Sequence, residues 1–220
     1  MNQFEALKFI LRQFAGRTKS HLSEFNSKRT VVLSCASLLP RTLKTDTEEL
    51  IKDWFPGIKI VKGQNYLKIS EKIEHESFSV EKIDESEKKL LTKQLIDRYY
   101  EEMIQKRSID QLAVQSKKVL VFTNSSISTE DLCNYLNQSG LQATKLHSKM
   151  RVNERIKNLS EFKEGKYFVM VCTDVGARGL DFDNLDMVIQ YDFAKNATIL
   201  LHRFGRTGRL NRPGKVISLI

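Results

Sequence analysis

Short apolar runs alternate along the chain with longer stretches in which apolar residues recur every three or four positions. The clearest runs are Lys118–Thr123, Leu141–His147, Tyr167–Thr173, Met187–Tyr191 and Lys215–Ile220. Because all of these runs except Leu141–His147 are largely apolar, rather than apolar at every second position, they predict strands that are buried on both faces of a sheet. The stretches between them predict helices. The pattern therefore predicts an α/β fold, a parallel sheet with helices on both faces.

Capping residues and glycines mark the helix boundaries in the second half of the chain. Ser128, with Asp131 three residues later, predicts the start of a helix that stops at Gly140. A second helix is predicted over Asn153–Glu164 and ends at Gly165. A further helix is expected between the last two strands.

The pattern in the first half is weaker. The expected elements are a strand at Val31–Ala36, a helix that Thr45 or Thr47 caps and that ends before Pro56, a strand at Ile58–Val61, partial alternation over Ile73–Ile83 and a charged helix over about Ser86–Lys106. The continuation of this last helix through Val114 is typical of a surface insertion.

Polar clusters follow the predicted strands of the second half. They are Asn124-Ser125-Ser126, His147-Ser148-Lys149 and Thr173-Asp174. Because the carboxyl ends of parallel strands meet at one edge of a sheet, we expect these clusters to lie together. The sequence therefore predicts a ligand site or a groove at this edge.

Residues 202–209 read His-Arg-Phe-Gly-Arg-Thr-Gly-Arg and contain arginines at three-residue spacing: Arg203, Arg206 and Arg209. On a helix this spacing would bring the arginines to one side, where they repel one another unless an anion joins them. The planar guanidinium matches phosphate geometry, and Gly205 and Gly208 leave room for a close approach. A solvated basic helix end and a targeting patch are the alternatives.

The segment Thr173–Asp181 has the hydroxyl and glycine content of a loop whose amides approach phosphates. Thr173 and Asp174 are suited either to contact a sugar-phosphate backbone or to cap the next short helix. Asp181 is suited either to accept from ribose hydroxyls or to pair with Arg178. The basic stretch Lys145–Lys157 is equally compatible with an RNA contact and with a solvated helix face.

The composition narrows the class of protein. Lys and Arg number 36 against 27 Asp and Glu, a net charge of +9 that favours polyanionic partners. No apolar run is long enough to span a membrane, so no membrane association is expected. Cys35, Cys133 and Cys172 stand alone in apolar contexts, which predicts buried thiols in a reducing compartment and no metal site.

The N-terminus carries no secretory signal. Residues 1–29 are basic, and Phe4, Leu7, Leu11 and Phe14 recur at helical spacing. This pattern is compatible with a mitochondrial presequence and with an ordinary amphipathic helix of a larger fold. We expect an intracellular protein, with cytoplasm, nucleus and mitochondrion all open. The chain stops at Ile220 inside an apolar run, which predicts that it is part of a longer protein.

Several ordered segments resemble the motifs of the DEAD-box RNA helicases, members of helicase superfamily 2. Ala177–Asp181, Tyr191-Asp192 and His202–Arg209 resemble motifs V and VI; Val121–Ser125 resembles motif IV; Leu146–Met150, with Arg155, Phe162 and Gly165 behind it, resembles the next block. The resemblance runs from about Val119 to the end. It extends weakly back to Cys35-Ala36-Ser37 with Pro40, which is similar to the Ser-Ala-Thr motif that closes the first lobe.

The resemblance implies a second RecA-like lobe over residues 73–220, with an insertion near 100–116. Residues 1–72 would be the C-terminal part of a first RecA-like lobe. In that family ATP, with Mg²⁺, lies between the two lobes of the complete protein. RNA is the implied partner, ribonucleoprotein assembly factors are further expected partners, and we expect a monomer.

The resemblance also implies residue roles. Arg206 and Arg209 would act as arginine fingers toward the ATP phosphates, and His202 would couple nucleotide state to lobe closure. Gly179 and Asp181 would lie on the nucleotide side. The RNA backbone would be held by Arg155, Thr173, Asp174 and Gly176, through contacts that read shape and sugar rather than base sequence.

The chain also departs from the family pattern at several motifs. No Gly-x-x-x-x-Gly-Lys-Thr loop and no Asp-Glu-Ala-Asp motif is present: Gly16–Ser20 has Thr18 before its lysine, and Asp84–Glu87 is better suited to start a helix. Leu200-Leu201 precedes His202, and Leu210–Pro213 follows the last arginine. We therefore expect no ATP hydrolysis and no tight nucleotide binding by this chain alone. A non-catalytic RNA-binding or scaffold module and a DNA helicase of the same superfamily are the alternatives.

Overall fold

The computed structural model describes residues 32, 47–55, 57–63, 66–106, 117–177, 182, 185–209 and 212–220. The chain divides into two units, Met1–Ala36 and Ser37–Ile220, and all described residues except Val32 belong to the second. The predicted strand Val31–Ala36, the basic N-terminal segment, the Cys35-Ala36-Ser37 motif and the insertion lie wholly or largely outside the described residues. The division into a partial first lobe and a second lobe stays a prediction.

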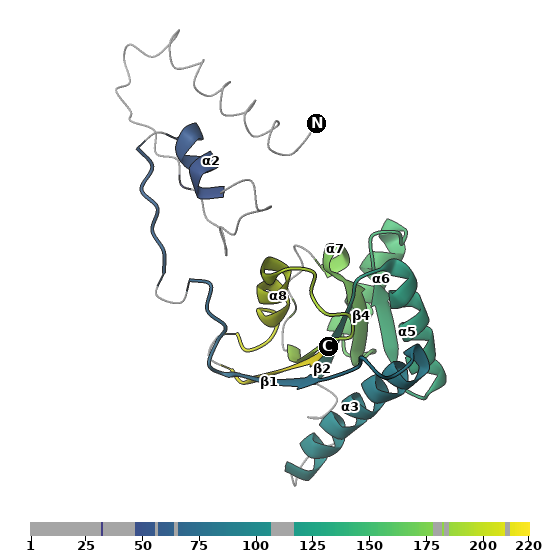
Figure 1. Cartoon of the computed structure of the whole chain (residues 1–220). Coiled ribbons are helices and arrows are strands. Elements are labelled where there is room, and N and C mark those ends of the chain that lie inside the picture. The colour runs from purple at the N-terminus through teal and green to yellow at the C-terminus, as the bar shows by residue number, and fades with distance from the viewer. Residues whose placement is uncertain are drawn as a thin grey trace. The chain divides into compact units, whose positions relative to one another are not determined.

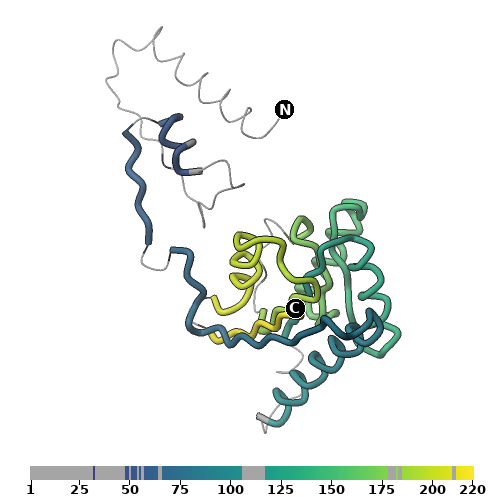
Figure 2. The backbone as a smooth tube through the Cα atoms, viewed as in Figure 1, coloured from purple at the N-terminus to yellow at the C-terminus, as the bar shows by residue number. Residues whose placement is uncertain are grey.

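Six parallel strands of the described chain form one sheet (Figure 1). They are β1 (Ile73–Phe78), β2 (Lys118–Thr123), β3 (Ala143–Leu146), β4 (Val169–Thr173), β5 (Leu185–Gln190) and β6 (Gly214–Leu219). Their order is β1-β6-β5-β2-β4-β3, and every neighbouring pair is parallel. Strands β1 and β6 lie side by side although they are far apart in the sequence (Figure 2). The predicted parallel sheet is confirmed.

Helices cover both faces of this sheet, as predicted. The described helices are α2 (Thr47–Trp54), α3 (Glu85–Lys106), α5 (Ser126–Gln138), α6 (Val152–Lys163), α7 (Asp174–Ala177) and α8 (Ala197–Phe204). Apolar residues of α3 and α5 pack on one face with Val119 and Val121 of β2. Residues of α6, α7 and α8 pack on the other face with Leu120 and Phe122. Because both faces are covered, both sets of strand residues are apolar, which explains the unbroken runs in the sequence.

The helix starts agree with the sequence at α3 but differ at α5. At α3 the Asp84 backbone N–H donates to Glu87 Oε2 (3.0 Å) and the Glu87 N–H donates to Asp84 Oδ1 (2.8 Å), so Asp84–Glu87 starts a helix as predicted. The capping residue of α5 is Ser125, whose Oγ accepts from the Ser128 N–H (3.0 Å). The prediction of Ser128 as the cap is wrong by one helical turn, because Ser128 already lies inside the helix.

The strand predicted at Ile58–Val61 does not form. These residues have no regular secondary structure, and Val61 is 90% exposed. A run of four residues becomes a strand only when a neighbouring strand supplies hydrogen bonds and a helix covers its side chains. Neither condition is met here within the described residues, since the sheet ends at β1 and β3.

The octapeptide 202–209 is only partly helical. Helix α8 ends at Phe204, and the chain then turns, with Gly208 in the left-handed region at φ +66°. The turn is held by the buried Thr207 hydroxyl, which donates to the Leu185 carbonyl (2.7 Å) and lies 3.1 Å from that of Asp186. The prediction that the three arginines share one helix face is therefore wrong, because the glycines end the helix after the first arginine.

Two other expectations concern described residues. Cys133 and Cys172 are buried free thiols, and burial raises the pKa of Cys133 to about 11, so both are poor nucleophiles. Cys35 lies outside the described residues. Among the helices that the structure describes, none has the length and apolar character that crossing a membrane requires.

We predict that Gly208→Ala destabilises the chain strongly. A Cβ at this position would lie 2.4 Å from Ile73 Cγ1 on strand β1, and the left-handed backbone adds a second penalty. The expected loss is about 2–4 kcal/mol of unfolding free energy, measured by urea denaturation. Gly63→Ala is the matched control, since nothing lies within 4 Å of a Cβ there. Equal stability of the two variants would contradict the packing of this turn on β1.

Candidate functional site

Polar side chains from several strands meet at the carboxyl edge of the sheet. Asn124 follows β2, Asp174 follows β4 and Asp192 follows β5, and all three contact one side chain, Arg203 of α8. The sequence predicted that polar clusters would gather here. It did not predict that an arginine of the octapeptide would join them.

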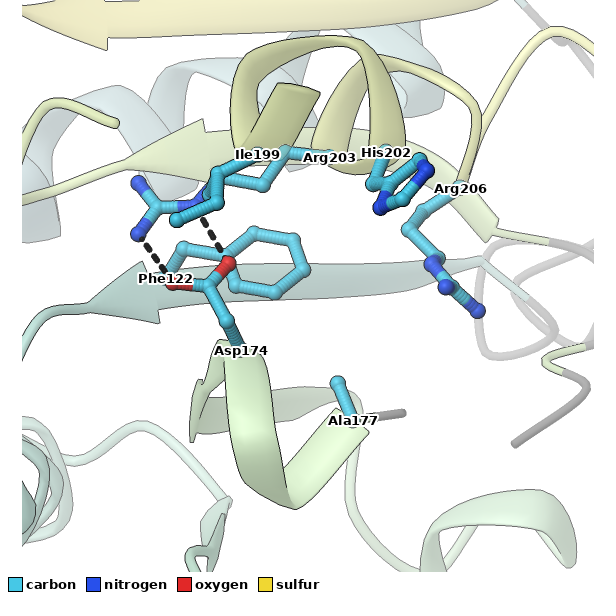
Figure 3. Close-up of a pocket in the computed structure, with 7 residues that line it drawn as sticks. All are labelled: Phe122, Asp174, Ala177, Ile199, His202, Arg203 and Arg206. Carbon is cyan, nitrogen blue, oxygen red and sulfur yellow. Dashed lines mark hydrogen bonds and ion pairs between the residues drawn. The ribbon is translucent and has the colours of Figure 1, made fainter. Parts of the chain in front are cut away.

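Arg203 forms a bidentate ion pair with Asp174. Its Nε donates to Asp174 Oδ1 and its Nη2 donates to Asp174 Oδ2, both at 2.8 Å (Figure 3). Arg203 is only 1% exposed. A buried guanidinium is tolerated only when its charge and its N–H groups are matched, and this geometry supplies the charge match.

The remaining Arg203 donors are also used inside the protein. Nη1 donates to the Asp192 carbonyl (2.6 Å) and lies 3.4 Å from Gln190 Oε1, while Nη2 also donates to Asn124 Oδ1 (2.9 Å). The guanidinium carbon lies 4.9 Å from the centre of the Phe122 ring. Every N–H of the guanidinium therefore has an internal acceptor. Arg203 thus links α8 to residues that follow three strands, β2, β4 and β5. None of its N–H groups is left to bind a ligand.

Asp192 extends this network to α3. Its Oδ2 accepts from the Asn124 backbone N–H (2.8 Å) and lies 3.3 Å from Ser128 Oγ, and its Oδ1 pairs with Lys88 Nζ (3.1 Å). The same Lys88 ammonium lies 4.1 Å from the centre of the Tyr191 ring. The Tyr191 hydroxyl donates to Glu85, and burial raises its pKa above the ordinary value.

Sequence reasoning missed Glu85, Lys88 and Gln190 as parts of this site. Their roles come from contacts between residues far apart in the chain, and spacing cannot reveal such contacts. The sequence did offer a signal for Glu85 and Lys88. Both lie in the first turn of α3, which follows the carboxyl end of β1 and therefore begins at this edge of the sheet.

The predicted RNA-contacting residues of the β4–α7 segment all have structural contacts. Thr173 Oγ1 accepts from the Gly176 N–H (3.2 Å) and so caps α7, which is the capping alternative given above. Asp174 is held by Arg203. A Cβ on Gly176 would lie 2.5 Å from the Leu146 carbonyl oxygen, so α7 packs closely on the end of β3 only because this residue is glycine. Their contacts with RNA stay a prediction.

His202 and Arg206 lie at a small hollow between α7 and α8. Its other lining residues are Phe122, Asp174, Ala177, Ile199 and Arg203, and its volume is about 30 Å³. In Figure 3 the Arg206 side chain extends away from the Arg203 guanidinium. Such a volume admits a few water molecules at most and cannot enclose a nucleotide. The hollow can form only one wall of a nucleotide site.

Arg209 lies at the end of the turn, and its Nε donates to the Gly205 carbonyl (2.6 Å) at the end of α8. Gly179 and Asp181, predicted for the nucleotide side, lie outside the described residues. The structure thus brings His202, Arg206 and Asp174 together and places Arg209 on the same turn. In the described part of the chain, no group of three or more acidic, histidine or cysteine side chains could hold a metal ion.

Arg155 of α6 contrasts with Arg203. It is half-buried, and its Nε is buried without a hydrogen-bond partner among the described residues. A buried guanidinium N–H without an acceptor is costly, and a bound anion would remove that cost. Arg155 is therefore a candidate to bind an anion at this edge.

Comparisons with known proteins agree with this geometry. Residues 99–211 match the family described as the helicase conserved C-terminal domain. The chain is 42% identical over 104 residues to the ATP-dependent rRNA helicase RRP3 of Kluyveromyces lactis (47% of this chain, 21% of the relative). It is 41% identical over 108 residues to DEAD-box ATP-dependent RNA helicase 39 of Arabidopsis thaliana (48% and 17%). The matched segment thus spans about a fifth of the length of these curated relatives.

Solved structures show the same fold. The Escherichia coli DEAD-box protein SrmB, solved bound to the regulator of ribonuclease activity A, gives a TM-score of 0.53 at 27% identity, covering 66% of this chain and 75% of SrmB. Saccharomyces cerevisiae Dbp5, solved bound to RNA and ADP BeF3, gives 0.63 at 24% identity, covering 79% and 42%, and shows the fold alone. The chain belongs to the helicase conserved C-terminal domain family and carries the C-terminal RecA-like lobe of the DEAD-box type.

Proposed function

We propose that this chain supplies the C-terminal portion of an ATP-dependent RNA helicase: one wall of an ATP site between two lobes, and part of an RNA groove. The observation that carries the proposal is the contrast between two arginines at one edge of the sheet. Each N–H of the Arg203 guanidinium has an internal acceptor, whereas the Arg155 Nε–H is buried without an acceptor among the described residues. This edge therefore combines an internal network around Arg203 with a cationic group at Arg155 that an anion would satisfy.

On the ATP side, Arg206 and Arg209 act as arginine fingers. Each would stabilise negative charge on the phosphates in the transition state of hydrolysis. Arg206 lies on the rim of the hollow, and Arg209 reaches a phosphate after releasing the Gly205 carbonyl. His202, which lines the same hollow as Arg206, couples the nucleotide to lobe closure. Gly179 and Asp181, outside the described residues, are the further residues that we propose for nucleotide binding.

The residues present fit the phosphates of ATP and do not fit Mg²⁺. Cationic side chains line the rim, but the described residues offer no cluster of metal ligands. Groups outside these residues must therefore hold the metal ion and the base. No Gly-x-x-x-x-Gly-Lys-Thr loop occurs in the 220 residues, which agrees with a half site.

On the RNA side, Arg155 pairs with a backbone phosphate. Thr173, Asp174 and Gly176, at the start of α7, contribute further contacts with the RNA backbone. The position of α7 depends on the ion pair between Asp174 and Arg203 and on the close packing of Gly176 against Leu146. Contacts of this kind hold the sugar-phosphate backbone without reading base sequence. The net charge of +9 favours such a partner.

The proposal extends to partners and location. The SrmB structure holds the regulator of ribonuclease activity A, which shows that a DEAD-box protein can bind a protein partner. We propose that ribonucleoprotein assembly factors bind this protein too, that it acts as a monomer, and that it is intracellular.

We predict that the chain alone hydrolyses no ATP above background, with or without RNA. In a two-lobe protein that contains this segment, Arg206→Gln should lower kcat by about 10³-fold or more, because a finger acts on the transition-state charge. A coupled steady-state ATPase assay measures both, with the exposed Lys195→Gln as control. Unchanged kcat in the Arg206 variant would overturn the finger role and favour the non-catalytic scaffold.

We predict that Arg155→Gln weakens RNA binding without lowering stability. In the described chain the Arg155 Nε–H has no hydrogen-bond partner that the substitution would remove. The substitution should therefore weaken the contact with an RNA phosphate and leave the fold unchanged. The slope of log affinity against log salt should fall by about 0.7, the value for one phosphate contact on a single strand. Fluorescence anisotropy with a labelled oligouridylate measures it, and Lys163→Gln, at the other end of α6, is the control. An unchanged slope would remove Arg155 from the RNA site.

A further inference from the structure

Two buried polar side chains interrupt the apolar strands β5 and β6. Gln190 of β5 is 0% exposed and Ser218 of β6 is 1% exposed, whereas the other fully buried side chains of these strands are apolar. Burying an amide or a hydroxyl is costly unless its hydrogen-bonding groups have partners. Here the partners form a continuous row that runs from Arg203 to His75, an exposed residue of the edge strand β1. We call His75, Ser218 and Gln190 the polar row.

The hydrogen bonds of the polar row have a fixed direction, which is set by Arg203. A guanidinium only donates, so the group of Gln190 that lies 3.4 Å from Arg203 Nη1 must be the carbonyl oxygen Oε1. The Gln190 amide Nε2 then donates to Ser218 Oγ (2.8 Å). The Ser218 hydroxyl has one hydrogen to donate, and His75 Nε2 lies 2.9 Å from its oxygen. The row is therefore complete when Ser218 donates to an unprotonated His75 Nε2.

Protonation of His75 would reverse the last hydrogen bond of the polar row. A charged imidazole carries a hydrogen on both ring nitrogens and can no longer accept. Nε2–H would then donate to Ser218 Oγ, which already accepts from Gln190, and the Ser218 hydrogen would have to turn to another acceptor. Because Ser218 and Gln190 are buried, the rearrangement changes the contacts inside the protein rather than contacts with water.

The His75 ring also packs against α8. It meets the Phe204 ring edge to face, with the ring centres 5.0 Å apart and the ring planes at 67°. Phe204 is the last residue of α8 and directly follows Arg203. His75 is thus joined to Arg203 by two routes, the polar row and the end of the helix. A change in the position of the His75 ring reaches both the guanidinium and the residue next to it.

The acidic neighbours of His75 in β1 are engaged on the opposite face of the sheet. Glu74 and Glu76 lie 4.0 and 2.6 Å from Lys215 of β6, and Glu76 also pairs with Arg98 of α3 (2.9 Å). The hydrogen bond from Lys215 is the main cause that lowers the pKa of Glu76, so this carboxylate stays charged when a histidine titrates. On the α8 side the contacts are aromatic and polar, apart from the guanidinium at the inner end of the polar row.

We propose that His75 is a positioning residue for the carboxyl edge of the sheet and that its charge regulates this edge. While His75 is neutral, the polar row holds Gln190 Oε1 toward Arg203, and Arg203 holds Asp174 in the bidentate pair. When His75 is charged, the row is rearranged at Ser218, and the contact of Arg203 with Gln190 changes with it. The coupling from His75 to Arg203 needs only these contacts, whereas its effect on RNA binding rests on the proposed function.

The test follows the Arg203 Nε–H signal by nuclear magnetic resonance in the ¹⁵N-labelled whole chain, without RNA, from about pH 5 to 8. In the wild type this signal should shift with the same midpoint as the ring signals of His75. His75→Gln keeps an amide oxygen that can accept from Ser218 but does not titrate, so its Arg203 signal should not show that midpoint. His147 and His202 are present in both proteins, so their own titration is common to the two profiles.

Ser218→Ala separates the polar row from a direct effect of charge. The variant leaves His75 able to titrate but removes the hydroxyl that joins it to Gln190, so the Arg203 signal should no longer follow the His75 midpoint. An Arg203 signal that still follows it would show that the charge acts through space, which would overturn the role of the row. Because Ser218 is buried, this variant can lose stability, whereas His75 is exposed, so His75→Gln tests the coupling without that risk.

Fluorescence anisotropy with a labelled oligouridylate at about pH 5.5 and 8 separates this inference from the proposed function. The wild type should lose affinity at the lower pH relative to His75→Gln. Tighter binding by the wild type than by the variant at the lower pH would be a general charge effect and would overturn the regulation. If neither protein binds RNA at either pH, the proposed function fails, while an Arg203 signal that follows His75 still establishes the coupling. An Arg203 signal that does not follow His75 in the wild type overturns the inference even if RNA binds.

Discussion

The carboxyl edge of this lobe depends on one buried guanidinium. Arg203 has no contact with solvent that could satisfy it, so each of its N–H groups must find an acceptor within the protein. The acceptors come from the ends of β2, β4 and β5, which the guanidinium therefore holds at fixed positions against α8. Removing one partner of such a buried pair costs about 3–5 kcal/mol, because the other charge is left uncompensated.

The division of work among the arginines follows from this constraint. Because α8 ends at Phe204 and the Thr207 hydroxyl is bonded to the start of β5, the Arg206 side chain extends away from Arg203 (Figure 3). Arg209 instead donates to the Gly205 carbonyl at the end of α8. Asp174 neutralises Arg203, and its position also fixes α7. The absence of a side chain at Gly176 lets α7 pack on the end of β3. The same contacts thus shape both the proposed ATP wall and the proposed RNA groove.

The sequence could predict the sheet because its strands are buried on both faces, so that runs such as Lys118–Thr123 carry no competing polar signal. It failed at Ile58–Val61, where an apolar run has no strand beside it. The resemblance to the DEAD-box helicases supplied the candidate residues, but it could not predict which residues each of them contacts. Whether an arginine lies inside a network or on a rim depends on where a helix ends and on which strands are neighbours. The pairing of β5 with β2, which brings Gln190 and Asn124 to Arg203, is not encoded in local spacing.

The most direct measurement follows the side-chain Nε–H signals of the arginines by nuclear magnetic resonance while an oligouridylate is added to the ¹⁵N-labelled chain. We expect the Arg203 signal to be protected from exchange with water and not to move, because its acceptors are internal. The Arg155 signal should shift as RNA binds. A shift at Arg203, or RNA binding that leaves the Arg155 signal unmoved, would overturn this division of roles between the two arginines.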